Sequence, residues 1–151
     1  MKKRIIFGLF IVALSVLVVA GCATPAPKPA AAAPTKAPAA ETPQGLVLDG
    51  AANYTTVKGD TLADIAASRY GGSNMYFFPL IRLANASVVP NPDEIEIGTN
   101  LVIPNLQRNL DNVGANALIR VDMLAIAGQY ERQGKPNAAQ TLRNLATRLS
   151  K

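Results

Sequence analysis

The apolar positions of this chain fall into three stretches with different spacing. An apolar run, interrupted only by Ser15, covers residues 5–20, directly after the basic opening "MKKR". Residues 23–44 show no period and consist mostly of alanine and proline. From residue 53 onward, apolar residues recur at every second position or at every third and fourth, which is typical of strands and of helices. The pattern predicts a leader, a spacer and a folded region.

The first part of the folded region, residues 53–106, predicts two strands and two helices. Residues 54–58 contain the β-branched run "TTV" and predict a strand. Residues 61–70 place Leu62 and Ile65 on one helical face. A second helix is expected around "FFPLIRLAN", with its proline near the first turn, and "TNLVIP" predicts the last strand. The order strand, helix, helix, strand predicts a small α+β unit.

The remaining residues, 107–151, predict a C-terminal helical hairpin. The first helix, around residues 118–130, is apolar on two faces, with Ile119, Met123, Ile126 and Tyr130 on one and Ala117, Val121 and Leu124 on the other. The sequence "RQGKP" ends this helix, and a second helix with a single apolar stripe follows. The first helix therefore has apolar surface left for a partner. We expect residues 115–150 to contact the small unit, another protein or a second copy of the chain.

The composition excludes several kinds of catalytic and metal site. The chain has no histidine and one cysteine. Catalysis by Ser-His-Asp or Cys-His groups, zinc sites of the usual Cys/His kind and an internal disulfide are therefore excluded. We expect no metal and no cofactor.

The net charge gives no reason to expect a nucleic-acid partner. The formal charge is +5, from 15 basic and 10 acidic residues. Residues 1–21 hold three of the basic residues and none of the acidic ones, so the chain without them has a net charge of +2. This excess is too small to indicate binding to a phosphate backbone.

The first 22 residues resemble the signal of a bacterial lipoprotein. A basic head and an apolar run that ends in small residues make up a secretory leader. The sequence "VAGC" resembles the lipobox, after which cleavage leaves an acylated cysteine at the start of the chain. We expect residues 1–21 to be removed and Cys22 to carry a lipid. An ordinary signal peptide that ends near a cysteine is the alternative.

The segment 22–52 is expected to be an extended tether on the lipid anchor. Alanine and proline bury too little apolar surface to fold, and proline keeps the chain stiff. The reach is on the order of 90 Å at about 3.1 Å per residue. Ala23 after the cysteine resembles the outer-membrane sorting pattern of diderm bacteria, so the expected location is the cell envelope, on the outer membrane facing the periplasm. A passive linker is the alternative.

A series of short motifs runs through residues 53–104 in a fixed order: Tyr54-Thr55, Gly59-Asp60-Thr61-Leu62, Ile65-Ala66, Tyr70-Gly71, Pro79-Leu80-Ile81, Ala84-Asn85, Asn91-Pro92-Asp93, Ile95, Gly98, Leu101, Ile103 and Pro104. In this order they resemble the LysM domain, a βααβ module with a two-stranded antiparallel sheet that binds the N-acetylglucosamine chains of peptidoglycan and chitin. Thr56 and Phe78 stand where the family has valine and tryptophan, which predicts looser packing. Ile97 stands where the family commonly has a proline before the glycine at Gly98, which predicts a looser loop.

The resemblance implies a shallow glycan-binding groove between the first strand–helix loop and the loop before the last strand. The implied glycan-binding residues are Gly59, Asp60, Thr61, Leu62, Asn91, Pro92, Asp93, Glu94 and Ile95. Glycine lets the backbone approach a ligand, and the free N–H groups at a helix start can donate to an acetamido carbonyl. Leu62 and Ile95 offer an apolar wall for the methyl group. The alternative is structural, because Thr61 and Asp64 form a capping box and "NPD" is an ordinary turn.

The expected function is therefore non-covalent binding of peptidoglycan by a membrane-anchored lipoprotein that is not an enzyme. Four carboxylates lie in or beside the two loops, at Asp60, Asp93, Glu94 and Glu96. Glycoside hydrolysis uses two carboxyl groups, but its general acid needs an apolar pocket deeper than a shallow groove. The alternative function is an envelope scaffold or adaptor whose helical hairpin recruits a partner such as a cell-wall enzyme.

Overall fold

The computed structural model describes residues 45–150. The leader, Cys22 and most of the expected tether lie outside the described residues. The described part contains, in order, β1 (Ala52–Thr55), α1 (Leu62–Tyr70), the 3₁₀ helix η1 (Gly72–Phe77), α2 (Phe78–Ala84), β2 (Asn100–Ile103), α3 (Leu106–Asp111), α4 (Val113–Arg132) and α5 (Pro136–Arg148). β1 and β2 pair antiparallel, so the expected mixture of helices with a two-stranded antiparallel sheet is confirmed.

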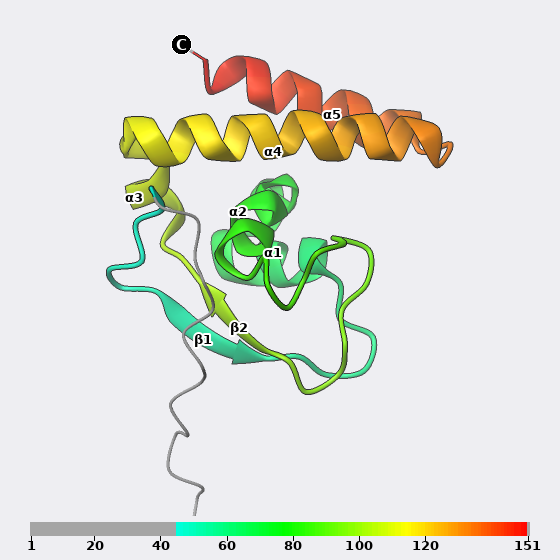
Figure 1. The fold of residues 1–151 in the computed structure, drawn as a ribbon. Helices are drawn as coiled ribbons and strands as arrows, with labels where there is room; N and C mark the ends of the chain where they lie inside the picture. The colour runs from blue at the N-terminus through cyan, green and yellow to red at the C-terminus, as the bar shows by residue number, and fades with distance from the viewer. Residues whose placement is uncertain (1–44, 151) are drawn as a thin grey trace, which may run out of the picture. The chain divides into compact units, whose positions relative to one another are not determined.

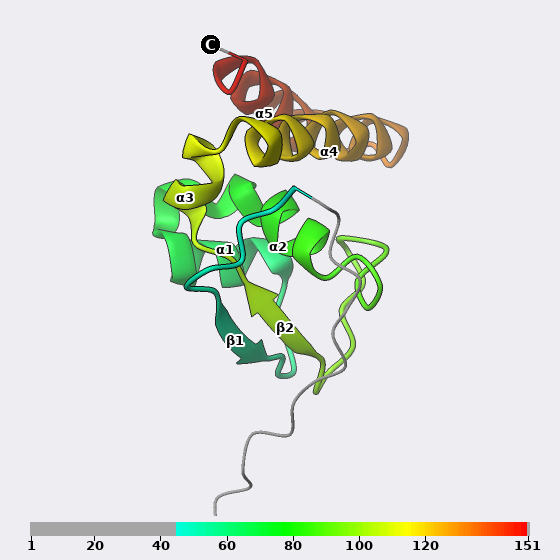
Figure 2. The same cartoon turned by 60° about the vertical axis from the view of Figure 1, so that its left-hand side comes forward.

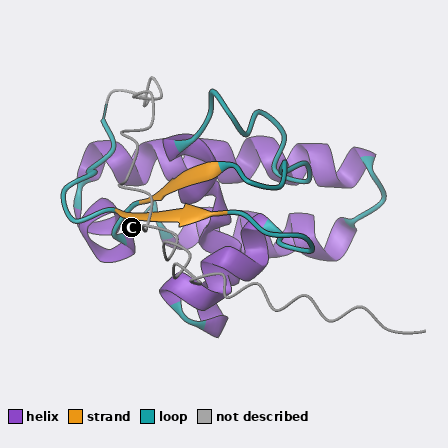
Figure 3. Ribbon diagram, turned by 90° about the horizontal axis from the view of Figure 1, so that it is seen from below, coloured by secondary structure: helices purple, strands orange, loops and turns teal. Residues whose placement is uncertain are grey.

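Pairing between the strands runs along the whole of β1 and β2 (Figure 3) and extends one residue further. The Thr56 N–H donates to the carbonyl of Thr99 at 3.0 Å. The strand predicted over 54–58 ends earlier, because the Val57 N–H donates at 2.8 Å to the Asp60 carboxylate and begins a turn.

The Thr56 side chain is buried, although looser packing was expected at this position. It is 2% exposed, and its hydroxyl donates to the carbonyl of Glu96 at 2.6 Å and accepts from the Thr99 N–H at 2.9 Å. Phe78 is likewise buried, with its ring centroid 6.4 Å from that of Tyr130. Both positions are therefore buried, and Thr56 adds two hydrogen bonds that hold the loop before β2 against the end of β1.

The first helix begins as its sequence predicts. The Thr61 hydroxyl oxygen accepts from the Asp64 N–H at 3.1 Å, and the hydroxyl donates to the Asp64 carboxylate at 2.6 Å. This caps the first turn of α1. α2 carries Pro79 in its first turn, where the missing N–H has no intrahelical acceptor. Between the two helices lies η1, which the sequence did not predict.

The apolar core is shared between the βααβ unit and the hairpin. α2 contacts both β2 and α4, and α4 packs along α5 (Figure 1). The largest fully buried apolar side chains come from these four elements and from α1, and include Leu62, Leu80, Ile81, Leu101, Ile119, Met123 and Leu142. The small unit therefore covers one apolar face of α4, which is the first of the partners expected for that helix.

An ion pair joins α2 to α4 beside this core. The Nε of Arg82 donates to Oδ2 of Asp122 at 2.9 Å, and its Nη2 contacts the other carboxylate oxygen. Asp122 is 6% exposed, so water shields the pair poorly. Arg82 also donates to the carbonyl of Pro90 at 3.3 Å. One guanidinium therefore connects α4 to the segment that follows α2.

The side-chain amides of two buried asparagines each pair with the N–H and carbonyl of one extended residue, as a neighbouring strand would. Asn85 donates to the carbonyl of Val102 at 2.7 Å and accepts from its N–H at 2.8 Å, which pairs part of the outer edge of β2. Asn109 on α3 makes the same two bonds with Val47, at 2.8 and 2.9 Å. Residues 45–51, which the sequence assigned to the tether, thus lie against α3 (Figure 2).

Among residues 45–150, no helix has both the length and the apolar character that crossing a membrane requires.

On α4, Val121 and Leu124 are 60% and 42% exposed. The second apolar stripe predicted for this helix therefore remains on the surface.

Removing one partner of the Arg82–Asp122 pair should destabilise the protein. Asp122→Ala leaves the largely buried Arg82 guanidinium without its anion. We expect the free energy of unfolding to fall by about 3 kcal/mol. The double variant Arg82→Met/Asp122→Leu removes both charges and should lose much less. Urea denaturation followed by circular dichroism measures both changes. A single variant no less stable than the double variant would contradict this account.

Candidate functional site

The turn between β1 and α1 is closed by one carboxylate. Oδ2 of Asp60 accepts from the Tyr54 hydroxyl at 2.7 Å and from the Val57 N–H at 2.8 Å. The hydrogen bond to Asp60 raises the pKa of the Tyr54 hydroxyl. Gly59 has φ +96°, which residues with a Cβ rarely adopt. Gly59 and Asp60 thus shape the turn, whether or not they also contact a ligand.

The start of α1 offers main-chain donors beside this turn. The Thr61 side chain occupies the N–H of Asp64. The N–H groups of Leu62 and Ala63 precede the first intrahelical hydrogen bond and have no acceptor among residues 45–150. These two groups are available to an acceptor from outside the chain.

The second loop, residues 91–95, has no regular structure of its own. The Asn91 side-chain oxygen accepts from the Asp93 N–H at 3.2 Å, and the Asn91 carbonyl accepts from the Glu94 N–H at 3.2 Å. This is the turn that the sequence predicts. Pro92 is buried, whereas Asp93 and Glu94 are exposed.

The end of α4 and the turn before α5 hold this second loop through three side-chain contacts, which we call the hairpin latch. The Tyr130 hydroxyl donates to Oδ1 of Asp93 at 2.9 Å, and Nζ of Lys135 donates to Oδ2 at 2.9 Å. Nε2 of Gln129 donates to Oδ1 of Asn91 at 3.2 Å. The Lys135 ammonium also lies 4.7 Å from the centroid of the Tyr130 ring. The latch connects residues that are far apart in sequence.

Both loops line one pocket of about 240 Å³. Six of the nine predicted site residues line it: Asp60, Thr61, Leu62, Pro92, Asp93 and Ile95. Three others, Gly59, Asn91 and Glu94, do not. The lining is completed by three residues that the sequence did not assign to the site: Ala63, Phe78 and Tyr130.

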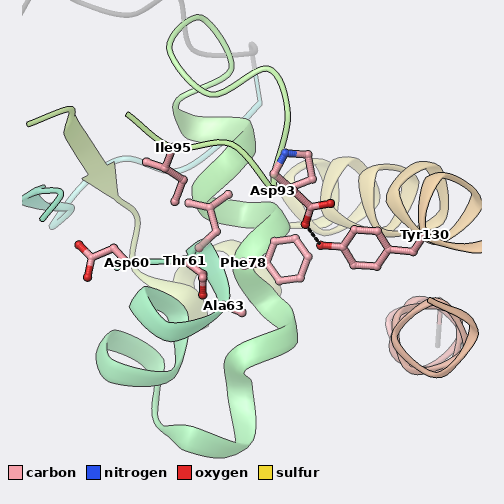
Figure 4. Close-up of a pocket in the computed structure, with 9 residues that line it drawn as sticks. Asp60, Thr61, Ala63, Phe78, Asp93, Ile95 and Tyr130 are labelled. Carbon is pink, nitrogen blue, oxygen red and sulfur yellow. Dashed lines mark hydrogen bonds between the residues drawn. The ribbon is translucent and has the colours of Figure 1, made fainter. Parts of the chain in front are cut away.

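The lining residues come from four parts of the fold: the β1–α1 turn with the start of α1, α2, the second loop and α4. Figure 4 shows Asp60 and Asp93 on opposite sides of the pocket, with Phe78 between them and Tyr130 beside Asp93. Ala63 could have been included from its position in the first turn of the predicted helix. Tyr130 reaches the pocket only through the packing of α4 on the small unit, and no local signal indicates this.

Hydrogen bonding outweighs burial at Asp93. Partial burial raises the pKa of its carboxyl, but the hydrogen bonds from Lys135 and Tyr130 lower it by more, so the pKa lies below the ordinary value. Burial and the hydrogen bond to Asp93 both raise the pKa of the Tyr130 hydroxyl, which keeps its proton at neutral pH. The latch therefore pairs a carboxylate with two donors at neutral pH.

The lining disfavours an anionic ligand and combines polar with apolar surface. The two lining carboxylates, Asp60 and Asp93, each accept two hydrogen bonds from the chain itself. No lysine or arginine lines the pocket, and Ile95 and Ala63 add partly exposed apolar surface. Within the described part of the chain, no three His, Cys, Asp or Glu side chains gather closely enough to hold a metal ion.

Lys135→Gln should raise the pKa of Asp93 toward the ordinary aspartate value of about 3.9. Because the pKa is lowered in the native protein, the latch contributes stability at neutral pH and loses it as the pH falls through the folded-state pKa. NMR titration of the Asp93 side-chain carbon measures both values. An unchanged pKa in the variant would show that Lys135 does not hold the carboxylate.

This chain shares a short stretch with two mycobacterial proteins. Over 65 residues it is 32% identical to Esterase MT1326 of Mycobacterium tuberculosis (strain CDC 1551 / Oshkosh) and to Esterase Rv1288 of strain ATCC 25618 / H37Rv. The stretch makes up 43% of this chain and 13% of each esterase, so the match does not carry their whole-protein activity to this chain. No family model and no solved structure matches the chain.

Proposed function

We propose that this protein binds the N-acetylglucosamine-containing glycan of peptidoglycan non-covalently, in the pocket between the β1–α1 turn and residues 91–95. A lipid on Cys22 would hold it on a membrane of the cell envelope, so that it links membrane and wall. One observation carries the proposal. Two loops from opposite ends of the βααβ unit meet around one pocket, and most of its lining belongs to the residues that the LysM resemblance implied.

The proposed contacts match the chemistry of an acetamido group, which has one N–H donor, one carbonyl acceptor and one methyl group. The N–H groups of Leu62 and Ala63 donate to the carbonyl oxygen. A carboxylate oxygen has two acceptor positions, so Asp93 can accept the amide N–H while it keeps its bonds to the latch. Ile95 supplies the apolar contact for the methyl group.

The charge of the lining supports an uncharged sugar. Asp60 and Asp93 lie on opposite sides of the pocket, and no basic side chain lines it. A sugar that carries a carboxylate would face both acids and be disfavoured, whereas N-acetylglucosamine carries no charge. A single small pocket binds weakly, so retention at the wall depends on many anchored copies.

A scaffold or adaptor function is the second candidate, and one observation favours it. The stripe on α4 that contains Val121 and Leu124 remains exposed after the other face has packed on the small unit. Val121→Glu places a charge on this stripe. The scaffold function predicts that partner association is lost, and the glycan function predicts that binding to peptidoglycan is unchanged.

Filling the pocket tests the glycan function. Ala63→Leu adds bulk to a lining residue on the first turn of α1. The test uses a protein of residues 23–151. We expect the share of this protein that sediments with purified, insoluble peptidoglycan to fall by about tenfold, because the larger side chain occupies the space of the ligand. Ala67→Leu is the matched control, since it makes the same change one turn later on α1, outside the lining.

Two results would count against the proposal. Equal sedimentation of the Ala63→Leu and Ala67→Leu proteins would show that glycan does not occupy this pocket. A wild-type chain that stays in the supernatant, while an established LysM protein sediments, would overturn glycan binding itself. Thermal unfolding of both variants checks that each remains folded.

A further inference from the structure

The second loop of the pocket depends on contacts with the hairpin. Neither a helix nor a strand lies between α2 and β2, so residues 91–95 have no regular element to fix them. The hairpin latch holds Asn91 and Asp93, and Arg82, paired with Asp122 of α4, donates to the carbonyl of Pro90. The chain is thus held by α2 at Pro90, directly before the loop, and by the hairpin at Asn91 and Asp93.

The contacts of the latch differ in how well water reaches them. Lys135 and Asp93 are partly exposed, at 47% and 29% of their side-chain surface, and such a pair contributes little by itself. Tyr130 is 8% exposed, and its ring packs near Phe78 in the shared core. The Tyr130 hydroxyl therefore donates to Asp93 from a rigid base, and this contact fixes the carboxylate most firmly.

We propose that the α4–α5 hairpin is part of the binding site, with Tyr130 and Lys135 as positioning residues that set the place of Asp93 and its loop before glycan arrives. This inference rests on the proposed function. It extends that function because both residues lie outside the βααβ unit that resembles the LysM domain.

The physical reason is pre-organisation. A loop that is ordered only on binding loses conformational freedom at that moment and weakens the net affinity. A loop already held by the latch does not have this cost. Loss of the latch should therefore weaken glycan binding even where the rest of the fold is unchanged.

The test compares two latch variants with a matched control by NMR titration with chitotetraose. Tyr130→Phe keeps the ring in the core and removes only the hydroxyl donor, and we expect the dissociation constant to rise about threefold to tenfold. Lys135→Gln should raise it about twofold, because its pair is exposed. Arg143→Gln removes the cation of another exposed ion pair of the hairpin, with Glu131, and should change nothing.

Amide hydrogen exchange without ligand provides a second readout. We expect faster exchange at Asp93 and Glu94 in Tyr130→Phe than in Arg143→Gln, with equal thermal midpoints in the two proteins. If the wild type binds chitotetraose and Tyr130→Phe binds it equally well, this inference is overturned. If the wild type does not bind, the proposed function fails instead. In that case the exchange rates alone test whether the latch orders the loop. Equal rates in Tyr130→Phe and Arg143→Gln would show that it does not.

Discussion

Burial of one face of α4 against the βααβ unit is the interaction on which the rest of this structure depends. A unit of about fifty residues removes too small a share of its surface from water to be very stable alone. α4 enlarges its core with Ile119, Met123 and Ile126. The same packing brings the end of α4 to the loop before β2 and lets Tyr130 reach the pocket. Stability and site geometry therefore have one cause, and a truncation of the hairpin would change both.

Polar groups at this contact are paired rather than absent. Arg82 and Asp122 face each other between α2 and α4, and among the described residues no buried side-chain nitrogen or oxygen lacks a hydrogen-bond partner. Such a pair adds little stability compared with apolar side chains of the same size. Its hydrogen bonds have fixed directions, however, and they are satisfied only when α4 lies in one register on α2. Asn85 and Asn109 act in the same way where backbone would otherwise be unpaired.

Elements with local signals could be predicted from the sequence. The cap at Thr61, the position of Pro79 and the helical period of the hairpin all depend on residues within one or two turns of one another. The helix α3 was missed although Asn105 caps it through the Arg108 N–H, because six residues are too few to show a period. The two loops of the site could be predicted as turns. The contribution of Tyr130 could not, because it reaches Asp93 across 37 positions through packing that the spacing does not encode.

The two candidate functions use opposite faces of one helix. Val121 lies nine positions before Tyr130, about two and a half turns at 3.6 residues per turn, so the exposed stripe faces away from the pocket. A partner on the stripe can alter glycan binding only if it prefers one of two arrangements of α4. With Ile119 and Met123 fully buried and Asp122 paired to Arg82, a shift of α4 would break the core and the ion pair together. A partner bound at Val121 would therefore leave the pocket as it is, so the two candidate functions do not exclude each other.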